Sequence, residues 1–498
     1  MTTADPYTTR INDPVHGTIF LSAVEREVIG ARSYQRLHNV FQLGLTHLVF
    51  PGANYSRFAH SLGTCHISGR LLNAIQSNRP GALSDKDVQI YRLAALLHDI
   101  GHYPFSHSME HAVNAHYPGQ KFLTSDTDQA DVSVGQPKEQ FDGLDLDNEP
   151  ASYDHELLGK RIITYDPEIK SILTRHGYPL EDVVQIFGNS KPGSLIHMVS
   201  SDLDCDRLDY LMRTAHHAGM PYGAVDIDYI VSQATIDDEG NFCFRQQALK
   251  AADHLLVSRF FDYQQVPFHK TVVAIELLLD DVLTQLFKAG AIQCSSSDML
   301  KRISTGEWAS FDDQHMIVLF RQYISATENQ QKQPDLVAKI KAILERKPPK
   351  LIWSLEKLVP RDSSDASFAH KAIVERLETK KGAWAQETGV PVENWKVWKN
   401  SFSLTKMGSN FSLSSIKQGS DELERSRAIR LLQDRSSKGN TRSKTIMEFD
   451  QALMAPLSNQ LYNAIRLYVL LDQSAPDYFE LRAKVSEVVT RDLNDLMK

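Results

Sequence analysis

Apolar residues recur at helical spacing along most of the chain. The pattern is plainest at residues 91–98 (YRLAALLH), at 196–212 and in the long stretch 252–287. A spacing of three to four residues between apolar positions is typical of amphipathic helices. Residues 234–244 alternate instead and contain an Asp-Glu-Gly turn, which predicts a small β-hairpin inserted among helices. The sequence therefore predicts a mainly α fold.

Two segments break this pattern. Residues 124–154 are acidic and poor in large apolar side chains, which predicts a flexible surface insertion. Residues 408–445 are rich in Ser, Gly and charge and end in a basic stretch at 435–445, and such charge runs are usually solvated loops. A change in composition near residue 290 marks the end of a first domain. We expect one domain over residues 1–290 and a helical C-terminal region over 291–498.

Composition and charge narrow the function classes. The 498 residues are 42% hydrophobic, which is enough for a sizeable core, and 54 Lys and Arg stand against 62 Asp and Glu. The net charge of −8 gives no general attraction to nucleic acid or anionic membrane, so a phosphate-bearing ligand must be held locally. The four cysteines form no CxxC pair, and neither a signal-peptide core nor a run of about 18 apolar residues is present. We expect a cytoplasmic protein without a membrane partner.

Histidines and acids gather in one short segment, HDIGHYPFSHSMEH, directly after the apolar stretch YRLAALL. A histidine beside an aspartate at the end of a buried helix offers nitrogen and oxygen ligands to one metal ion. This mixture suits zinc, iron or manganese, whereas an all-oxygen set would suit calcium or magnesium. A metal needs about four ligands, so others must come from distant parts of the chain. The histidines and acids of this segment are His98, Asp99, His102, His107, Glu110 and His111.

Two other segments supply the missing ligands. Arg57 and His60 are three residues apart on a predicted helix, which sets a phosphate-binding guanidinium beside an imidazole. Asp206 interrupts an apolar and aromatic stripe, and a buried carboxylate requires a partner. Taken alone, His60 is more often a core histidine, and Asp206 could cap a helix or pair with an arginine. The acids that compete with Asp206 for the ligand role are Asp202, Asp204 and Asp209. Together the three segments predict a metal centre.

The order of these residues resembles the HD superfamily, whose pattern is a distal His, then His-Asp, then a distal Asp. The stretches around them look like its deoxynucleoside triphosphate triphosphohydrolase branch. That branch includes a human enzyme with a SAM and an HD domain, which this sequence resembles without the SAM domain. The likeness covers roughly residues 11–275 and is weaker after them. The matching stretches are INDPVHG (11–17), FQLG (41–44), VFPGANYSRFAHSLG (49–63), LLHDIGHYPFSH (96–107) and DLDCDRLDY (202–210).

The resemblance implies an HD-domain helical fold, a reaction and a set of site residues. A divalent iron, manganese or zinc ion would activate water for attack on the α-phosphorus, releasing a deoxynucleoside and triphosphate. Magnesium could accompany the triphosphate. The metal would be bound by His60, His98, Asp99 and Asp206. The substrate would be bound by Arg57, Arg207 and Arg259 at the phosphates, Tyr210 against the sugar and Gln42 at the 3'-hydroxyl. The remaining active-site histidines would be His102, His107 and His155, with His107 as general acid and Glu110 holding its ring.

Some positions depart from the family pattern. Thr214 stands where an aspartate helps to read the 3'-hydroxyl, so sugar discrimination is open. His38 replaces the arginine that reads an activating guanine nucleotide, so we expect no GTP activation of that kind. Asn12, Arg245 and Lys270 still match positions that bind a regulatory nucleotide between subunits. The family also implies a homo-oligomer: a dimer, tetramer or hexamer.

Two other functions stay open. The first is an HD phosphohydrolase for a nucleoside monophosphate, a cyclic nucleotide or an alarmone, because the metal core does not choose the substrate. The second is a non-catalytic sensor of nucleotides or single-stranded nucleic acid that uses the basic stretch 435–445. Arg57, Arg207 and Arg259 favour several phosphates, and the full set of metal ligands favours catalysis.

Overall fold

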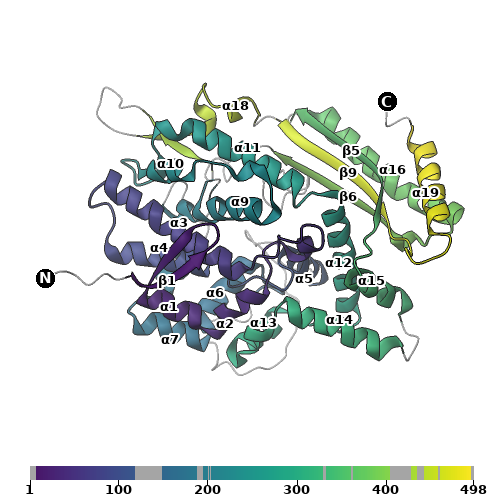
Figure 1. The fold of residues 1–498 in the computed structure, drawn as a ribbon, viewed down its shortest axis with the longest axis horizontal. Helices are drawn as coiled ribbons and strands as arrows, with labels where there is room; N and C mark the ends of the chain where they lie inside the picture. The colour runs from purple at the N-terminus through teal and green to yellow at the C-terminus, as the bar shows by residue number, and fades with distance from the viewer. Residues whose placement is uncertain are drawn as a thin grey trace, which may run out of the picture.

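Helices make up most of the chain (Figure 1), and the predicted mainly α fold is confirmed. The structure, a computed structural model, describes residues 7–117, 149–187, 195–199, 201, 203–328, 333–360, 363–403, 428–433, 442–457 and 460–494. Residues 124–148 of the predicted insertion and residues 435–441 of the basic stretch lie outside this set.

In the described residues up to 218, a hairpin is followed by the helices α1 to α9, and the long buried helix α3 lies among them. α3 packs against α4 on one side and α9 on another, which brings together three segments that are far apart in the sequence. These elements are β1 (Tyr7–Asp13), β2 (Gly17–Ser22), α1 (Ala23–Gly30), α2 (Arg32–Gln35), α3 (Arg57–Asn78), α4 (Asp85–Leu97), α5 (His107–His116), α6 (His155–Tyr165), α7 (Pro167–Arg175), α8 (Leu180–Val184) and α9 (Cys205–Ala218).

Serine and aspartate side chains set the starts of several helices. Ser22 and Ser84 each accept a hydrogen bond from the third helical residue, whose own carboxylate caps the serine amide in return. Ser56 caps α3 in the simpler way, and Asp204 caps α9 through the amide of Arg207. Such caps satisfy the amides that a helix leaves unpaired at its first turn.

Two of the apolar stretches are divided in ways that periodicity did not show. Residues 195–198 form a short 3-10 turn, and a new helix, α9, begins only at Cys205, after its cap Asp204. The stretch 252–287 contains two helices, α11 (Leu249–Gln265) and α12 (Lys270–Lys288), which are separated at Pro267. Proline lacks the amide hydrogen that a helix interior needs, so the first helix ends before it.

The predicted hairpin is present at β3 (Ala234–Ile236) and β4 (Phe242–Phe244), with antiparallel pairing. It does not stand alone, because β7 (Arg430–Leu432) and β8 (Ser443–Thr445) extend it to a four-stranded sheet in the order β3-β4-β7-β8. α10 (Ile227–Ser232) leads into this hairpin, and α18 (Met454–Leu457) follows β8.

The C-terminal region contains the expected helices and also a three-stranded antiparallel sheet that we did not anticipate. β9 lies in the centre and pairs with β5 and β6 on either side. α16 and α19 pack on this sheet, and α12 contacts β5 and β6 (Figure 1). The elements after α12 are α13 (Ser296–Thr305), α14 (Asp313–Glu328), α15 (Pro334–Leu344), β5 (Lys350–Pro360), α16 (Ser364–Thr388), β6 (Trp395–Ser403), β9 (Gln460–Val469) and α19 (Tyr478–Leu493).

The hydrophobic core around α3 contains residues on both sides of residue 290, where the first domain was expected to end. The core that surrounds α3 continues through Ile343 and takes in Ile429 to Met454, whereas a separate core between Trp353 and Leu493 lies beside the three-stranded sheet. The division between residues 290 and 291 stays a prediction. Among the described helices, none has the length and hydropathy that a membrane span would need. The four cysteines are buried and unpaired.

Candidate metal centre and active site

α3 presents the first of the predicted ligands. The helix begins at Arg57, and His60 lies one turn further on, fully buried. Gly63 lies on the next turn, where a Cβ atom would stand 1.8 Å from Oδ1 of Asp209. α9 can approach α3 this closely only because residue 63 has no side chain.

His98 and Asp99 lie where α4 ends. The chain turns after Leu97, so His102 lies in the turn that follows the helix. Gly101 allows this turn to contact α6, because a Cβ there would stand 2.1 Å from the carbonyl oxygen of His155. The close approach sets His102 and His155 face to face, with ring centroids 4.1 Å apart.

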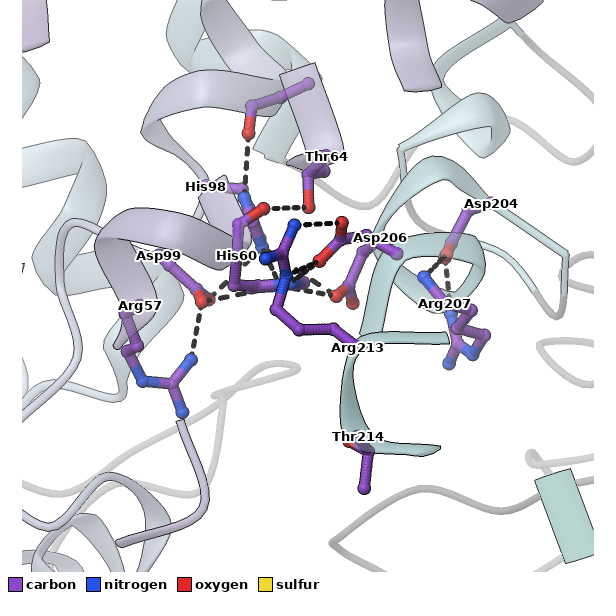
Figure 2. A network of polar contacts seen from close by, with 12 residues as sticks. Arg57, His60, Thr64, His98, Asp99, Asp204, Asp206, Arg207, Arg213 and Thr214 are labelled. Atoms are coloured by element: carbon purple, nitrogen blue, oxygen red, sulfur yellow. Dashed lines mark hydrogen bonds and ion pairs between the residues drawn. The ribbon is translucent and has the colours of Figure 1, made fainter. Parts of the chain in front are cut away.

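The ligand atoms of His60, His98 and Asp206 lie close enough together to share one metal ion, and Asp99, the fourth predicted ligand, lies beside the two imidazoles (Figure 2). Nε2 of His60 lies 3.2 Å from Nε2 of His98 and 2.9 Å from Oδ1 of Asp206. Oδ1 of Asp99 lies 3.3 Å from Nε2 of His98, and Oδ2 of Asp99 lies 3.7 Å from Nε2 of His60. Two imidazoles and the carboxylate of Asp206 thus face a common centre, with the carboxylate of Asp99 next to it, and nitrogen and oxygen ligands of this kind suit a metal ion.

The hydrogen bonds behind the two imidazoles fit a cation. Nδ1 of His60 donates to Oδ2 of Asp209 at 2.7 Å, and Nδ1 of His98 donates to the carbonyl oxygen of Ala95 at 2.8 Å. With both Nδ1 atoms protonated, the two Nε2 atoms of neutral rings would direct bare lone pairs at each other and at carboxylates. A proton or a metal ion must therefore lie among them. Such outer hydrogen bonds to carboxylate and carbonyl are typical of metal-binding histidines.

A buried charge network supports His60 from behind. Arg213 binds both oxygens of Asp209, each at 2.9 Å, and also pairs with Asp13 at 2.8 Å, while Nε2 of His16 lies 2.5 Å from Oδ1 of Asp209. Burial opposes the ionised form of Asp209, but the charge of Arg213 and these hydrogen bonds hold its pKa well below the ordinary range. Burial likewise disfavours charge on His60, yet Asp206 and Asp209 raise its pKa to about 10.

A second group of titratable side chains adjoins the first. Glu110 accepts from Nδ1 of His107 at 3.0 Å and from Nδ1 of His155 at 2.9 Å, so one carboxylate holds both rings. His102 donates from Nε2 to Oδ1 of Asp99 at 3.1 Å. Burial and the charge of Arg57 hold the pKa of His102 well below its usual value, whereas Glu110 overcomes burial and raises that of His155 to about 9. Asp99 thus links the two groups.

The loop before α5 is strained. Phe105 and Ser106 both have φ near 55°, a left-handed conformation that is costly for residues other than glycine. Asp313, at the start of α14, holds the loop by accepting from the amide of Phe105 at 2.7 Å. Ser106 accepts from Nε of Arg57 at 2.9 Å. The loop places His107 at the first position of α5, beside His102 and His155.

Two of the predicted phosphate-binding arginines, Arg57 and Arg207, lie on the helices that carry candidate metal ligands, and Arg259 lies on α11, which packs against α9. Arg57 is buried and donates to Oδ2 of Asp99 at 2.5 Å (Figure 2). Arg207, in the first turn of α9, pairs with Asp204, the residue that caps this helix. Arg259 is buried on α11, and its charge acts on the pKa of Tyr210, which burial raises well above the ordinary value.

The predicted sugar contacts lie on neighbouring elements. Tyr210 is one helical turn after Asp206 on α9. The amide of Gln42 donates to the carbonyl oxygen of Tyr55 at 3.1 Å, and Oε1 of Gln42 is buried with no hydrogen-bond partner among the described residues. The hydroxyl of Tyr55 in turn lies 2.7 Å from that of Thr214.

The three residues predicted for a regulatory nucleotide lie on separate elements. Asn12 is on β1, Arg245 follows β4, and Lys270 is the first residue of α12. Lys270 lines an open cavity of about 540 Å³ with residues of α11, β5 and β9. The regulatory role of the three residues stays a prediction.

Several supporting residues were not found from the sequence. Asp209 had appeared only as a competitor for the ligand role, and nothing in the pattern singled out Asp13, Arg213 or Asp313. Arg36 was missed as well; it stacks on Trp308 and donates from Nη2 to the carbonyl oxygen of His102 at 2.8 Å. A buried charge in an apolar context is the only signal that could have found these residues.

The chain carries an HD domain: residues 57–146 match the model of that family, and the match includes His60, His98 and Asp99. Among curated relatives, the uncharacterized protein YwfO of Bacillus subtilis is 30% identical over 275 residues, 54% of this chain and 54% of its own length. The deoxynucleoside triphosphate triphosphohydrolase SAMHD1 of Homo sapiens is 28% identical over 283 residues, 54% of this chain and 43% of that protein. The chain thus spans about half the length of the curated relatives it matches.

Solved structures extend the likeness of the fold along nearly the whole chain. A hypothetical protein from Aquifex aeolicus matches with a TM-score of 0.62 and 23% identity, over 96% of this chain and 99% of the other. A phosphohydrolase from Bacteroides thetaiotaomicron matches with a TM-score of 0.62 and 20% identity, over 92% and 99% of the two chains. At these identities the likeness is one of fold.

Proposed function

We propose that this protein is a metal-dependent phosphohydrolase that cleaves deoxynucleoside triphosphates to a deoxynucleoside and triphosphate. The observation that carries the proposal is the convergence of His60, His98 and Asp206, with Asp99 next to both imidazoles, beside three further histidines and buried arginines. The relationship to SAMHD1, a protein named as a deoxynucleoside triphosphate triphosphohydrolase, supports the substrate class.

The donor set favours a borderline transition metal. Two imidazole nitrogens and two carboxylates suit iron, manganese or zinc better than calcium or magnesium. When bound, such an ion supplies Lewis-acid activation of water and offsets charge on the reacting phosphate. Magnesium would arrive with the triphosphate.

The protein's own side chains then hold the substrate and move the proton. Arg57, Arg207 and Arg259 would bind the phosphates, since guanidinium groups match phosphate oxygens in charge and geometry. Water attacks the α-phosphorus, the bond from phosphorus to the 5'-oxygen breaks, and that oxygen takes a proton. His107 would donate this proton, because Glu110 already holds its Nδ1 and so fixes the direction of Nε2.

The test is product analysis with a panel of nucleotides. The purified protein is stripped with a chelator, reloaded with manganese, iron or zinc in turn, and supplied with each dNTP, each NTP, monophosphates and cyclic nucleotides. We expect deoxynucleoside and triphosphate, and in water labelled with oxygen-18 the label should appear in the triphosphate alone. Release of pyrophosphate and a monophosphate, or turnover of cyclic nucleotides or monophosphates only, would contradict the proposal.

Two variants tie the activity to the site. The double substitution His98→Ala and Asp99→Ala should abolish turnover and metal binding while the protein stays folded. His111→Ala is a matched control in the same segment, because His111 is exposed and pairs only at the surface with Asp280. Unchanged turnover in the double variant would refute the site. Cytoplasmic location, assembly as a homo-oligomer and binding of a nucleotide effector or single-stranded nucleic acid stay predictions.

A further inference from the structure

Polar side chains continue along α9 beyond the candidate metal ligand Asp206; we call the region around Tyr210 and Thr214 the polar corner. Asp206, Tyr210 and Thr214 are spaced by four residues, so they lie on one face of this helix in successive turns. Thr214 is buried, and its hydroxyl is engaged by that of Tyr55 at 2.7 Å. This face of α9 therefore runs from the candidate metal ligand Asp206 to the place where the hydroxyl groups of Thr214 and Tyr55 meet.

α11 brings a carboxylate to this corner. Asp262 is 2% exposed, and its Oδ1 accepts from the hydroxyl of Tyr222 at 2.6 Å. Asp262 lies three residues after Arg259 on α11, and this helix packs against α9. Burial raises the pKa of Tyr210, and the charges of Arg259 and Asp262 act on the same phenol, which places both groups around Tyr210.

The groups around Asp262 stabilise its ionised form less than burial destabilises it. Burial outweighs the hydrogen bond from Tyr222 and the charge of Arg259, and raises the pKa of Asp262 to about 7. Asp253, on the same helix and equally buried, shows what a structural carboxylate looks like here: its two oxygens accept from the backbone amides of Leu453 and Met454, at 2.8 and 3.2 Å. Asp262 has a hydroxyl donor, Tyr222, in place of the two backbone amides that hold Asp253, and perturbed acids of this kind concentrate at functional sites.

The position of Asp262 indicates which donor it meets. Arg259, a proposed phosphate contact, lies three residues earlier on the same face of α11, and its charge acts on Asp262. In a nucleotide the group bonded next to the phosphates is the sugar with its 3'-hydroxyl, whereas the base lies further away. A carboxylate accepts from a hydroxyl donor, and Tyr222 fixes the orientation of the acceptor.

We propose that Asp262, oriented by Tyr222, accepts a hydrogen bond from the sugar 3'-hydroxyl and so selects nucleotides in which that hydroxyl is free. This inference rests on the proposed function, because it needs a nucleotide whose phosphates lie at Arg259. Asp262 is then a residue that determines specificity, and Tyr222 is a positioning residue.

The experiment compares kcat/KM for each dNTP with that for the matching dideoxynucleotide, which lacks the 3'-hydroxyl. A buried site that pairs with a hydroxyl strongly rejects an analogue without it, so we expect the native protein to prefer the dNTP by at least about 100-fold. Asp262→Asn should reduce this preference to about tenfold or less, mainly through slower turnover of the dNTP. Tyr222→Phe should give an intermediate loss. Asp253→Asn, the matched control on the same helix, should leave the preference unchanged.

The outcomes separate the two proposals. If the native protein hydrolyses dNTPs and dideoxynucleotides equally well, or if Asp262→Asn and Tyr222→Phe both keep the full preference, the inference is wrong while the proposed function stands. If Asp262→Asn changes the order of preference among bases but not among sugars, Asp262 reads the base and the inference is again wrong. If the native protein hydrolyses no dNTP with any metal, the proposed function itself fails. Tyr222→Phe keeps the shape of the side chain, so it tests the idea even if Asp262→Asn does not fold.

Discussion

Asp209→Asn tests whether the charge network behind His60 holds this candidate metal ligand in place. The carboxylate accepts from Nδ1 of His60 on one oxygen, from Arg213 on both, and lies 2.5 Å from His16. An amide of the same shape has one acceptor oxygen and turns its NH₂ group toward donors. At least one buried donor therefore loses its partner, and Arg213 keeps only Asp13 as a counter-charge.

Two effects of different size are expected from this change. Breaking a buried ion pair costs about 3–5 kcal/mol, and the remaining pair with Asp13 puts the expected loss in the free energy of unfolding near the lower limit, about 3 kcal/mol. Loss of an outer carboxylate behind a metal-binding histidine lowers metal affinity by about 10–100-fold, which is about 1.4–2.8 kcal/mol. The variant should therefore be less stable and also bind metal more weakly.

Calorimetric titration of the stripped protein with manganese or zinc measures the affinity, and urea unfolding of the same preparation measures stability. Asp237→Asn is the control, because Asp237 is also buried but bonds to Ser443 and Asn241 near the four-stranded sheet. It should lower stability and leave metal affinity alone. If Asp209→Asn is folded and its metal dissociation constant changes less than threefold, the network does not orient His60 and the reasoning is wrong.

Three other changes probe the scaffold. Gly63→Ala would place a Cβ 1.8 Å from Oδ1 of Asp209, so we expect about 1–3 kcal/mol of destabilisation in urea and weaker metal binding together. Burial opposes ionisation of Glu25, but two hydrogen bonds from Arg92 hold its pKa below 4.5, so its stabilising contribution is present at neutral pH and disappears as pH falls below 4.5. Glu25→Gln should flatten the dependence of urea stability on pH over this interval; an unchanged slope would contradict the assignment. Asp313→Ala removes the acceptor that holds the strained loop before α5 and should lower kcat more than tenfold at unchanged metal affinity, as steady-state kinetics would reveal.

The sequence predicted the mainly α fold and the segments that meet at the candidate site, for reasons that are local. The segment HDIGHYPFSHSMEH concentrates ligand chemistry behind an apolar helix, and such a helix can bury that chemistry only against other helices. The hairpin at residues 234–244 was also visible, because its alternation and turn residues are contiguous.

What the sequence could not predict depends on partners that are distant along the chain. Asp206 and Asp209 look alike in DLDCDRLDY, and only the position of α9 against α3 makes one a candidate ligand and the other its support. The three-stranded sheet was missed because β5 pairs with β9 across about a hundred residues, and its strand KLIWSLEKLVP mixes charged and apolar positions. The division of 196–212 depended on Asp204, whose side chain caps α9 and so starts a new helix.

The two groups of the candidate site are joined by one side chain, and this has a consequence for how substitutions combine. Oδ1 of Asp99 accepts from His102 at 3.1 Å and lies 3.3 Å from Nε2 of His98, while Oδ2 binds Arg57 at 2.5 Å. Asp99 therefore contacts a candidate metal ligand, a member of the second histidine group and a proposed phosphate contact at once. Glu110, in contrast, bonds only within the second group. Effects of changes at Glu110 and Asp206 on the free energy of the transition state should therefore be nearly additive, whereas changes at Asp99 and His102 should be strongly non-additive, because each alters the hydrogen bond that the other makes.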